Sequence, residues 1–263
     1  MDVSIFHKRY GPWALVTGAS SGIGTEFARL LAKQGLNVVV AARRQALLDK
    51  LVAELRESGV NARAVVIDLS KEGAALQLDK AVADLDVGLV VSNAGTGAPG
   101  RFLDEDHGEQ LERFRLNALS HLDIAHVFGR RLAGRSGGGL IFGGAMGAAH
   151  GIPFMATDAG SKALVQSLGE SLHLELKDRS IQVMTLIVPP TDTAIITKFG
   201  LDPAQMPMKP MSPRQCASEA LNDFKKGRST SLPGAVNRIM NALIPASVAR
   251  TLMGAMIRKT LRS

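Results

Sequence analysis

A glycine-rich turn between an apolar run and a helical pattern constrains the fold of this chain more than any other feature. The turn is Thr17–Gly24 (TGASSGIG), and it follows the apolar run Trp13–Val16. Gly18 permits a tight turn, Gly22 lets the backbone approach an anionic group, and Gly24 lets a helix pack closely on a strand. Strand, turn and helix in this order predict a cradle for the pyrophosphate of a dinucleotide at the helix N-terminus.

The remaining sequence alternates short β-branched runs with amphipathic helical patterns, and Gly35 stands where the C-cap of the first helix belongs. This order predicts an α/β, doubly wound, Rossmann-type fold, with a parallel sheet of about seven strands and helices on both faces. We expect strands at residues 13–16, 36–42, 64–67, 89–91, 140–142 and 183–188. We expect helices at residues 23–33, 45–58, 72–84, 105–132 and 157–178.

Composition points to one enzyme-sized domain over residues 1–263. The net charge is +7, but basic and acidic residues alternate over most of the chain, so we expect no nucleic-acid partner. Cys216 is the only cysteine and no His or Cys residues have metal-ligand spacing, so we expect no metal site. No apolar run approaches the roughly 18 residues that span a bilayer, and residues 1–10 lack the apolar core of a secretory signal, so we expect a cytoplasmic protein.

The end of the second expected strand carries information on the choice of dinucleotide. It reads Ala42-Arg43-Arg44, where a site selective for NAD usually carries an acidic residue. Guanidinium groups form charged, bidentate hydrogen bonds with phosphates. Arg43 and Arg44 therefore favour the 2′-phosphate of NADP, and we expect NADP(H) as the cofactor.

Four further motifs follow at spacings that, with the glycine turn, resemble the short-chain dehydrogenase/reductase family from about Gly11 to about Gly234. They are Asp68-Leu69, Asn93-Ala94-Gly95, Asn117 and Ser161-Lys162-Ala163. The resemblance implies that Asp68 lies near the adenine, Asn93 shapes the central cofactor wall, Lys162 holds the nicotinamide ribose and Thr193 approaches the carboxamide.

With the glycine turn and the two arginines, the resemblance gives a full set of expected cofactor-binding residues. These are Gly18, Ser20, Ser21, Gly22, Ile23, Gly24, Arg43, Arg44, Asp68, Leu69, Asn93, Ala94, Gly95, Lys162, Pro189, Thr191 and Thr193. The resemblance also implies a homodimer or homotetramer built on the expected helices 105–132 and 157–178.

The chain departs from the family pattern where that pattern places its proton-handling groups. The family has a Tyr four residues before the active-site Lys and a Ser thirteen residues before that Tyr, whereas this chain has Asp158 and Ala145. The Tyr hydroxyl exchanges the proton of the carbinol oxygen and the Ser hydroxyl fixes the carbonyl. The Pro-Gly expected after strand six is also changed, to Val188-Pro189. We therefore expect an atypical active site.

Asp158, Lys162 and Asn117 are the expected catalytic residues of this atypical site. Asp158 and Lys162 are four residues apart on one helix face and can form an ion pair, which would stabilise the carboxylate over the acid. An ionised Asp158 accepts a proton but donates one poorly to a ketone, and burial could raise its pKa. The family role of Asn117 is to hold a water or to kink the helix beside Lys162.

The sequence leaves three kinds of activity open. The first is an NADP(H)-dependent oxidoreductase that reduces a bulky apolar carbonyl or an iminium-type substrate, the latter needing no strong acid. The second is a non-redox isomerase, dehydratase or cyclase with Asp158 as base; some fungal alkaloid reductase/cyclases of this superfamily, which join iminium reduction to a Diels–Alder ring closure, are similar in having lost the Ser and the Tyr. The third is a catalytically silent partner subunit, which the intact cofactor motifs disfavour.

Substrate specificity is expected to lie in three loops beyond the strand ends, at residues 96–102, 146–155 and 190–211. The third loop, a lid near 190–212, is rich in Ile, Phe and Met, which favours a bulky apolar substrate. Its apolar residues are Ile195, Ile196, Phe199, Met206, Met208 and Met211. The segment 242–263 is basic and amphipathic; it could contact a membrane surface, but packing on its own or a partner subunit is the preferred interpretation.

Overall fold

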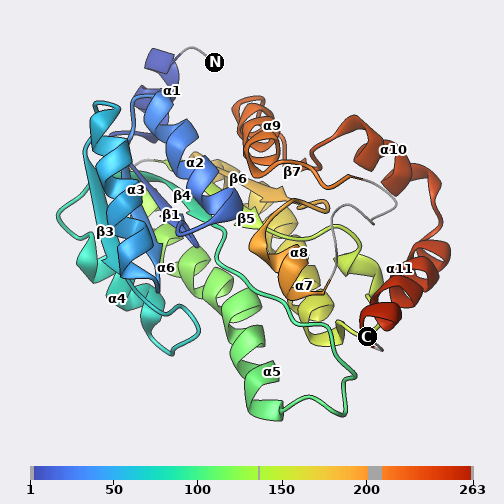
Figure 1. Cartoon of the computed structure of the whole chain (residues 1–263). Helices are drawn as coiled ribbons and strands as arrows, with labels where there is room; N and C mark the ends of the chain where they lie inside the picture. Colours follow the sequence, from blue (N-terminus) through green and yellow to red (C-terminus); the bar gives the residue numbers. More distant parts are fainter. Residues whose placement is uncertain (1–2, 136, 201–208, 262–263) are drawn as a thin grey trace.

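The computed structural model describes residues 3–135, 137–200 and 209–261. In this part of the chain seven parallel strands form one sheet in the order β3-β2-β1-β4-β5-β6-β7 (Figure 1). The strands are β1 Trp13–Thr17, β2 Asn37–Ala42, β3 Ala62–Val66, β4 Val87–Ser92, β5 Gly138–Gly143, β6 Ile181–Leu186 and β7 Thr230–Ser231. The predicted doubly wound sheet is confirmed.

The bounds predicted for β6 are wrong by two residues. The strand begins at Ile181 because it pairs with β5 from its first residue, Gly138, and it ends at Leu186, opposite Gly143. The sequence pattern did not indicate this start, because the polar residue Gln182 interrupts the apolar run. Its buried side chain accepts a hydrogen bond from the Tyr10 hydroxyl at 2.6 Å, so a polar residue is satisfied inside the sheet.

The helices cover both faces of the sheet (Figure 1). The helical elements are α1 Val3–Tyr10, α2 Gly22–Lys33, α3 Gln45–Glu57, α4 Ala74–Ala81, α5 His107–Phe114, the π-helix η1 Arg115–Leu119, α6 Ser120–Gly134, η2 Ala148–His150, α7 Ala156–Glu175, η3 Leu176–Arg179, α8 Ala194–Lys198, α9 Pro213–Lys225, α10 Ala235–Leu243 and α11 Ala246–Thr260. The helix predicted over 105–132 is observed as one continuous helical segment, α5–η1–α6, and the prediction missed only the π-helix η1 within it.

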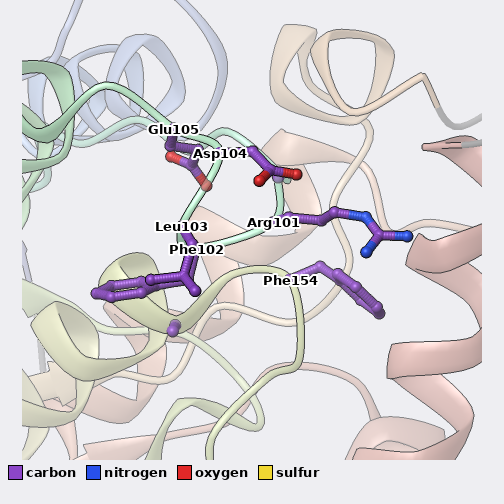
Figure 2. Close-up of a pocket in the computed structure, with 8 residues that line it drawn as sticks. Arg101, Phe102, Leu103, Asp104, Glu105 and Phe154 are labelled. Atoms are coloured by element: carbon purple, nitrogen blue, oxygen red, sulfur yellow. The ribbon is translucent and has the colours of Figure 1, made fainter.

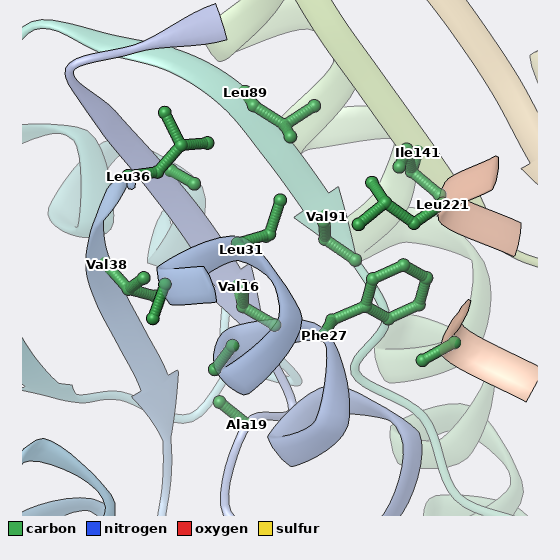
Figure 3. Packing of buried hydrophobic residues seen from close by; sticks show 14 of the residues in the cluster. Val16, Ala19, Phe27, Leu31, Leu36, Val38, Leu89, Val91, Ile141 and Leu221 are labelled. Carbon is green, nitrogen blue, oxygen red and sulfur yellow. The ribbon is translucent and has the colours of Figure 1, made fainter. Parts of the chain in front are cut away.

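Two apolar cores lie on opposite faces of the sheet. One forms between the strands and helices α1, α2, α3 and α9, the other between the strands and helices α4, α6 and α7. Neighbouring strand residues alternate between them: Leu15 belongs to the second core and Val16 to the first. Figure 3 shows Phe27 and Leu31 of α2 packed over the strand residues of the first core.

The strand order reverses at β1, which pairs with β2 on one side and with β4 on the other. In such sheets ligands bind in the crevice beyond the carboxyl ends of the strands at this reversal. The glycine turn Thr17–Gly24 leaves β1 there, and Asn93-Ala94-Gly95 leaves β4. The fold therefore brings the two motifs to one edge of the sheet.

The lid follows β6, and the C-terminal segment follows β7. Ser212 caps α9 by accepting a hydrogen bond from the Gln215 N–H at 3.2 Å. The lid contains the short helix α8, whereas Met206 and Met208 lie outside the described residues. The basic segment expected over 242–263 is not one helix, because Pro245 separates α10 from α11.

Candidate active site

The glycine turn has the geometry that its spacing predicts. Gly18 and Gly22 have positive φ angles of 66° and 59°, which strain any other residue. A Cβ on Gly24 would lie 2.4 Å from the Gly18 carbonyl oxygen, so only glycine lets α2 begin this close to β1. The turn places Ser20 and Ser21 at the N-terminus of α2, where anions bind well.

Arg44 lies across this turn. Its Nη2 donates hydrogen bonds to the Ser20 and Ser21 hydroxyls, each at 2.8 Å. Arg43 is exposed beside it, and its charge helps to stabilise the carboxylate of Asp68. The structure thus brings a guanidinium, two hydroxyls and a helix N-terminus together at the predicted cofactor position.

Asp68 forms a turn of its own at the end of β3. Burial alone would raise the pKa of Asp68, but hydrogen bonds from the Ser70 N–H and hydroxyl, with the nearby charge of Arg43, lower this pKa below its ordinary value. The carboxylate is therefore ionised at neutral pH and able to accept hydrogen bonds. Leu69 is buried in the core beneath it.

Two side chains hold the peptide Asn93-Ala94-Gly95 in place. Thr17 Oγ1 accepts hydrogen bonds from the Asn93 N–H at 3.0 Å and the Ala94 N–H at 3.1 Å. His121 is fully buried; its Nε2 lies 3.1 Å from the Ala94 carbonyl oxygen and its Nδ1 lies 2.7 Å from the Ser92 hydroxyl. A carbonyl only accepts, so Nε2 carries the proton and Nδ1 accepts from Ser92.

His121 is a positioning residue that the sequence reasoning missed. Burial, with the nearby charge of Lys162, holds the pKa of His121 well below its ordinary value, so the ring is neutral. A signal was present in the sequence, because His121 lies four residues after Asn117 and therefore on the same helix face.

Lys162 lies where the ends of β4 and β5 meet. Its Nζ donates a hydrogen bond to the Gly143 carbonyl oxygen at 2.7 Å. A Cβ on Gly95 would lie 3.1 Å from this Nζ and 3.2 Å from Asn117 Oδ1, so the glycine leaves room for both groups. Burial lowers the pKa of Lys162 to about 8.

Asn117 connects the irregular helix to the loop after β4. Its carboxamide accepts a hydrogen bond from the Thr96 N–H at 2.9 Å and donates one to the Thr96 carbonyl at 2.8 Å. Asn117 lies in the π-helix η1. The helix beside Lys162 therefore has a π-helical turn where the family role of Asn117 predicted a kink.

Asp158 is buried, and three donors surround its carboxylate. Oδ2 accepts a hydrogen bond from the Ala98 N–H at 3.1 Å, and Oδ1 accepts one from Asn117 Nδ2 at 3.3 Å. Arg113 Nε makes no hydrogen bond and lies 3.6 Å from Oδ1, while Arg113 Nη2 pairs with Glu105. The carboxylate thus belongs to a buried ionic cluster of Glu105, Arg113 and Asp158.

The expected ion pair between Asp158 and Lys162 is wrong. Lys162 turns to the Gly143 carbonyl, and the cation that reaches Asp158 is Arg113, from another helix. Neighbouring cations do lower the pKa of Asp158, as expected, but the net shift is upward, the alternative that burial left open. Burial raises this pKa and outweighs the opposing effects of the Ala98 N–H, Arg113 and Lys162.

The remaining predicted residues surround these groups. Ala145 follows β5, and its carbonyl accepts a hydrogen bond from Gln166 Nε2 at 2.6 Å. Thr193 lies against the glycine turn, since a Cβ on Gly22 would be 3.1 Å from its Cγ2. Pro189 is buried, and its carbonyl accepts the hydrogen bond of the Thr191 hydroxyl at 2.7 Å.

The loop over residues 96–102 contacts both of the other predicted specificity loops. Gly100 N–H donates to the Phe154 carbonyl at 2.9 Å, and Lys198 of the lid donates to the Thr96 hydroxyl at 3.1 Å. A Cβ on Gly97 would lie 2.7 Å from the ring of Phe199, so the lid rests directly on this loop.

A hollow of about 380 Å³ opens beside the junction of two of these loops (Figure 2). Its lining residues are Gly100, Arg101, Phe102, Leu103, Asp104, Glu105, Phe154 and Ala156. Glu105 therefore joins the hollow to the buried ionic cluster.

The C-terminal helix α11 packs on the loop over residues 146–155 within its own chain. Arg250 Nε donates a hydrogen bond to the His150 carbonyl at 2.8 Å. A Cβ on Gly254 would lie 2.9 Å from Pro153, so the helix approaches this loop closely. These contacts place the inner side of α11 against its own chain.

Comparison with known proteins gives consistent matches. The family model described as short chain dehydrogenase matches residues 12–203. The very-long-chain 3-oxoacyl-CoA reductase of Neurospora crassa is 31% identical over 97% of this chain and 77% of its own. A short-chain dehydrogenase from Sphingobium yanoikuyae in complex with NADPH has a TM-score of 0.78 and 27% identity, covering 96% of this chain and 95% of that chain. A 7β-hydroxysteroid dehydrogenase structure has a TM-score of 0.85 and 25% identity, covering 95% and 99%.

Proposed function

The chain belongs to the short chain dehydrogenase family of oxidoreductases, and on this premise we propose that it is an NADP(H)-dependent reductase of a bulky apolar carbonyl or iminium-type substrate. The observation that carries the choice of cofactor is the guanidinium of Arg44 on the hydroxyls of Ser20 and Ser21. A cation at this position favours a phosphate on the adenosine ribose. The related NADPH complex supports the same choice.

The residues present fit this cofactor. Gly18 and Gly22 have positive φ and carry no Cβ atom, which suits a turn that holds a pyrophosphate at the N-terminus of α2. Arg43 and Arg44 would hold the 2′-phosphate, and Lys162 would hold the nicotinamide ribose. When bound, NADP(H) supplies hydride transfer.

A bulky apolar substrate is supported by the composition of the lid and by the relatives. Ile195, Ile196 and Phe199 lie in or next to α8, which rests on the loop over residues 96–102. The names of two relatives specify a very-long-chain 3-oxoacyl-CoA and a 7β-hydroxysteroid. We propose that this chain accepts a substrate of similar bulk.

The proton path differs from that of a reductase with the usual Ser and Tyr, because we assign Ala145 and Asp158 to those two positions. Each oxygen of Asp158 already accepts a hydrogen bond, from the Ala98 N–H or from Asn117. Both hydrogen bonds tie Asp158 to protein groups, which favours a positioning role for this carboxylate and so favours reduction over the non-redox alternatives that need it as a base. An iminium carries its own positive charge and needs no proton from the protein, whereas for a carbonyl the ammonium of Lys162 is the available donor.

A titration of the purified protein with NADPH and NADH, read by nicotinamide fluorescence, tests the cofactor. We expect NADPH to bind more tightly than NADH. Arg44→Ala should weaken NADPH binding about 10- to 100-fold and leave NADH binding unchanged, because it removes a charged hydrogen-bond donor to the phosphate. Arg130→Ala, an exposed arginine on α6, is the matched control.

Two outcomes would contradict this proposal. Absence of binding to either nucleotide would exclude hydride transfer, and equal binding with no effect of Arg44→Ala would exclude NADP selectivity. If NADPH binds, its oxidation should be followed with long-chain 3-oxoacyl-CoA, steroid ketone and cyclic iminium substrates. A pH profile then separates the substrates, since reduction of a carbonyl should fall above about pH 8 as Lys162 loses its proton.

A further inference from the structure

Helices α10 and α11 lie at the outer edge of the molecule (Figure 1). Both helices expose large apolar side chains. The exposed set, here named the C-terminal apolar face, is Val236, Ile239, Leu243, Val248 and Leu252. The spacing within each helix puts these residues on one side of it. Leu243 is 75% exposed and Leu252 is 60% exposed, so nothing in the described chain covers them.

The opposite sides of the two helices are fixed to the rest of the chain. Asn237 of α10 is buried and donates a hydrogen bond to the Pro233 carbonyl at 2.9 Å. Gly254 and Ile257 of α11 are buried, and Gly254 abuts Pro153. The C-terminal apolar face is therefore presented outward by helices that are anchored on their inner sides.

The sequence around this face is basic and contains no acidic side chain. No Asp or Glu follows Asp223, whereas eight Lys or Arg residues do. Arg258 and Lys259 of α11 are exposed, and among the described residues neither forms an ion pair. Exposed apolar side chains beside uncompensated cations match the chemistry of an anionic lipid surface.

We propose that α10 and α11 form a membrane-surface element, which inserts the C-terminal apolar face among the acyl chains of an anionic bilayer and places Arg258 and Lys259 at its headgroups. A second copy of the chain fits this face less well, because symmetric pairing would bring two acid-free basic segments together.

The geometry favours helices that lie on the bilayer over helices that cross it. Within the described residues no single helix has the length and apolar character of a span, and α10 and α11 reach both criteria only together, across a bend of 115°. Crossing would also detach α11 from Pro153 and His150. If α10 and α11 lie on the surface of the bilayer, α11 keeps these contacts. The bilayer is then beside the loop over residues 146–155, and only the assignment of this loop to substrate specificity rests on the proposed function.

Vesicle flotation tests the proposal with the full chain and without nucleotide or substrate, so its result is independent of the proposed function. Vesicles of phosphatidylcholine alone are compared with vesicles that contain about 30% phosphatidylserine, at low and high salt. We expect the protein to bind the anionic vesicles, and high salt to weaken this binding.

The double variant Leu243→Glu with Leu252→Glu should lower the partition coefficient at least tenfold, because it puts charge on the inserted face. Its matched control is Leu174→Glu, which changes a 68% exposed leucine at the end of α7 and should have no effect. Unchanged melting temperatures would show that all variants fold.

The charge is tested in the same way. Arg258→Gln with Lys259→Gln should lower partitioning to anionic vesicles roughly 10- to 25-fold, since each cation near such a surface contributes about fivefold. Lys177→Gln with Arg179→Gln, in the exposed helix η3, should leave it unchanged.

Several results would overturn the proposal. These are no binding to anionic vesicles, equal binding to neutral ones, or the same loss in the control variants as in the test variants. A dimer in analytical ultracentrifugation that Leu243→Glu with Leu252→Glu dissociates, without vesicle binding by the unsubstituted protein, would assign the face to a second copy instead.

Discussion

Replacing Arg113 tests whether the buried ionic cluster depends on a single cation. The guanidinium pairs with Glu105 and lies 3.6 Å from Asp158, and the arginine side chain is only 10% exposed. Arg113→Met keeps the apolar volume and leaves two carboxylates without their cation. Breaking a buried ion pair from one side costs about 3–5 kcal/mol. Because Arg113 Nε lies as far as 3.6 Å from Asp158 Oδ1, we expect a loss of unfolding free energy near the lower limit, about 3 kcal/mol. This loss corresponds to a fall of roughly 6–9 °C in Tm.

The expected loss depends on pH, and its sign follows from Asp158. The pKa of this carboxyl is raised by burial from its ordinary value of 3.8, so ionisation destabilises the folded chain. Arg113 lowers this pKa, so its removal increases the free-energy cost of keeping Asp158 ionised in the folded chain. This cost is present in full above the pKa of Asp158 in the folded state and disappears as the pH falls toward 3.8. Urea unfolding at pH 7.5 and pH 5.0 should therefore give a smaller loss at pH 5.0.

Arg29 provides the matched control, because it also pairs with two carboxylates, Glu26 and Glu54, but is 39% exposed. Arg29→Met should cost less than about 1 kcal/mol. Adding Asp158→Asn to Arg113→Met should restore part of the stability at pH 7.5, since it removes an unpaired charge. A loss for Arg113→Met as small as that for Arg29→Met, or independent of pH, would refute this account of the cluster.

Three further predictions concern the groups around Lys162. Gly95→Ala should weaken NADPH binding at least tenfold in the fluorescence titration, because its Cβ would crowd Lys162 and Asn117. His121→Ala should lower the unfolding free energy by about 3 kcal/mol in urea, since it leaves a cavity and a buried Ala94 carbonyl without a donor. Lys162→Met should raise Tm at pH 7. Burial lowers the pKa of Lys162 from 10.5 to about 8, so the buried ammonium destabilises the folded chain in full below pH 8. The gain in Tm should vanish as the pH rises to 10.5. Each prediction is contradicted if its variant has the NADPH affinity, the unfolding free energy or the Tm of the unsubstituted protein, respectively.

The sheet and the glycine turn could be predicted because the signals for them are local. Glycines at 18, 22 and 24 indicate the backbone conformation of a single turn, and apolar runs indicate strands that are buried on both faces. The π-helix η1 could not be predicted in this way, because one extra residue per turn over Arg115–Leu119 leaves the surrounding helical pattern intact.

The partners of Asp158 could not be predicted because they come from distant parts of the chain. Spacing identifies residues that share a helix face, and so it suggested Lys162. The groups that reach the carboxylate are the Ala98 N–H and the side chains of Asn117 and Arg113. Their approach depends on how α5 and the loop after β4 pack on α7, and no local pattern encodes that packing.

These contacts give Asp158 a role that differs from that of the tyrosine whose position we assign to it. The carboxylate fixes the Ala98 N–H, and the neighbouring residues of the same loop carry the lid, through Lys198 on Thr96 and Phe199 on Gly97. A residue that holds this loop determines where the lid rests and thus the space left for the substrate. We therefore propose that Asp158 is a positioning residue. Under the proposed function, a positioning Asp158 would replace a proton donor by a fixed substrate loop, and this would favour an acceptor that arrives with its own positive charge.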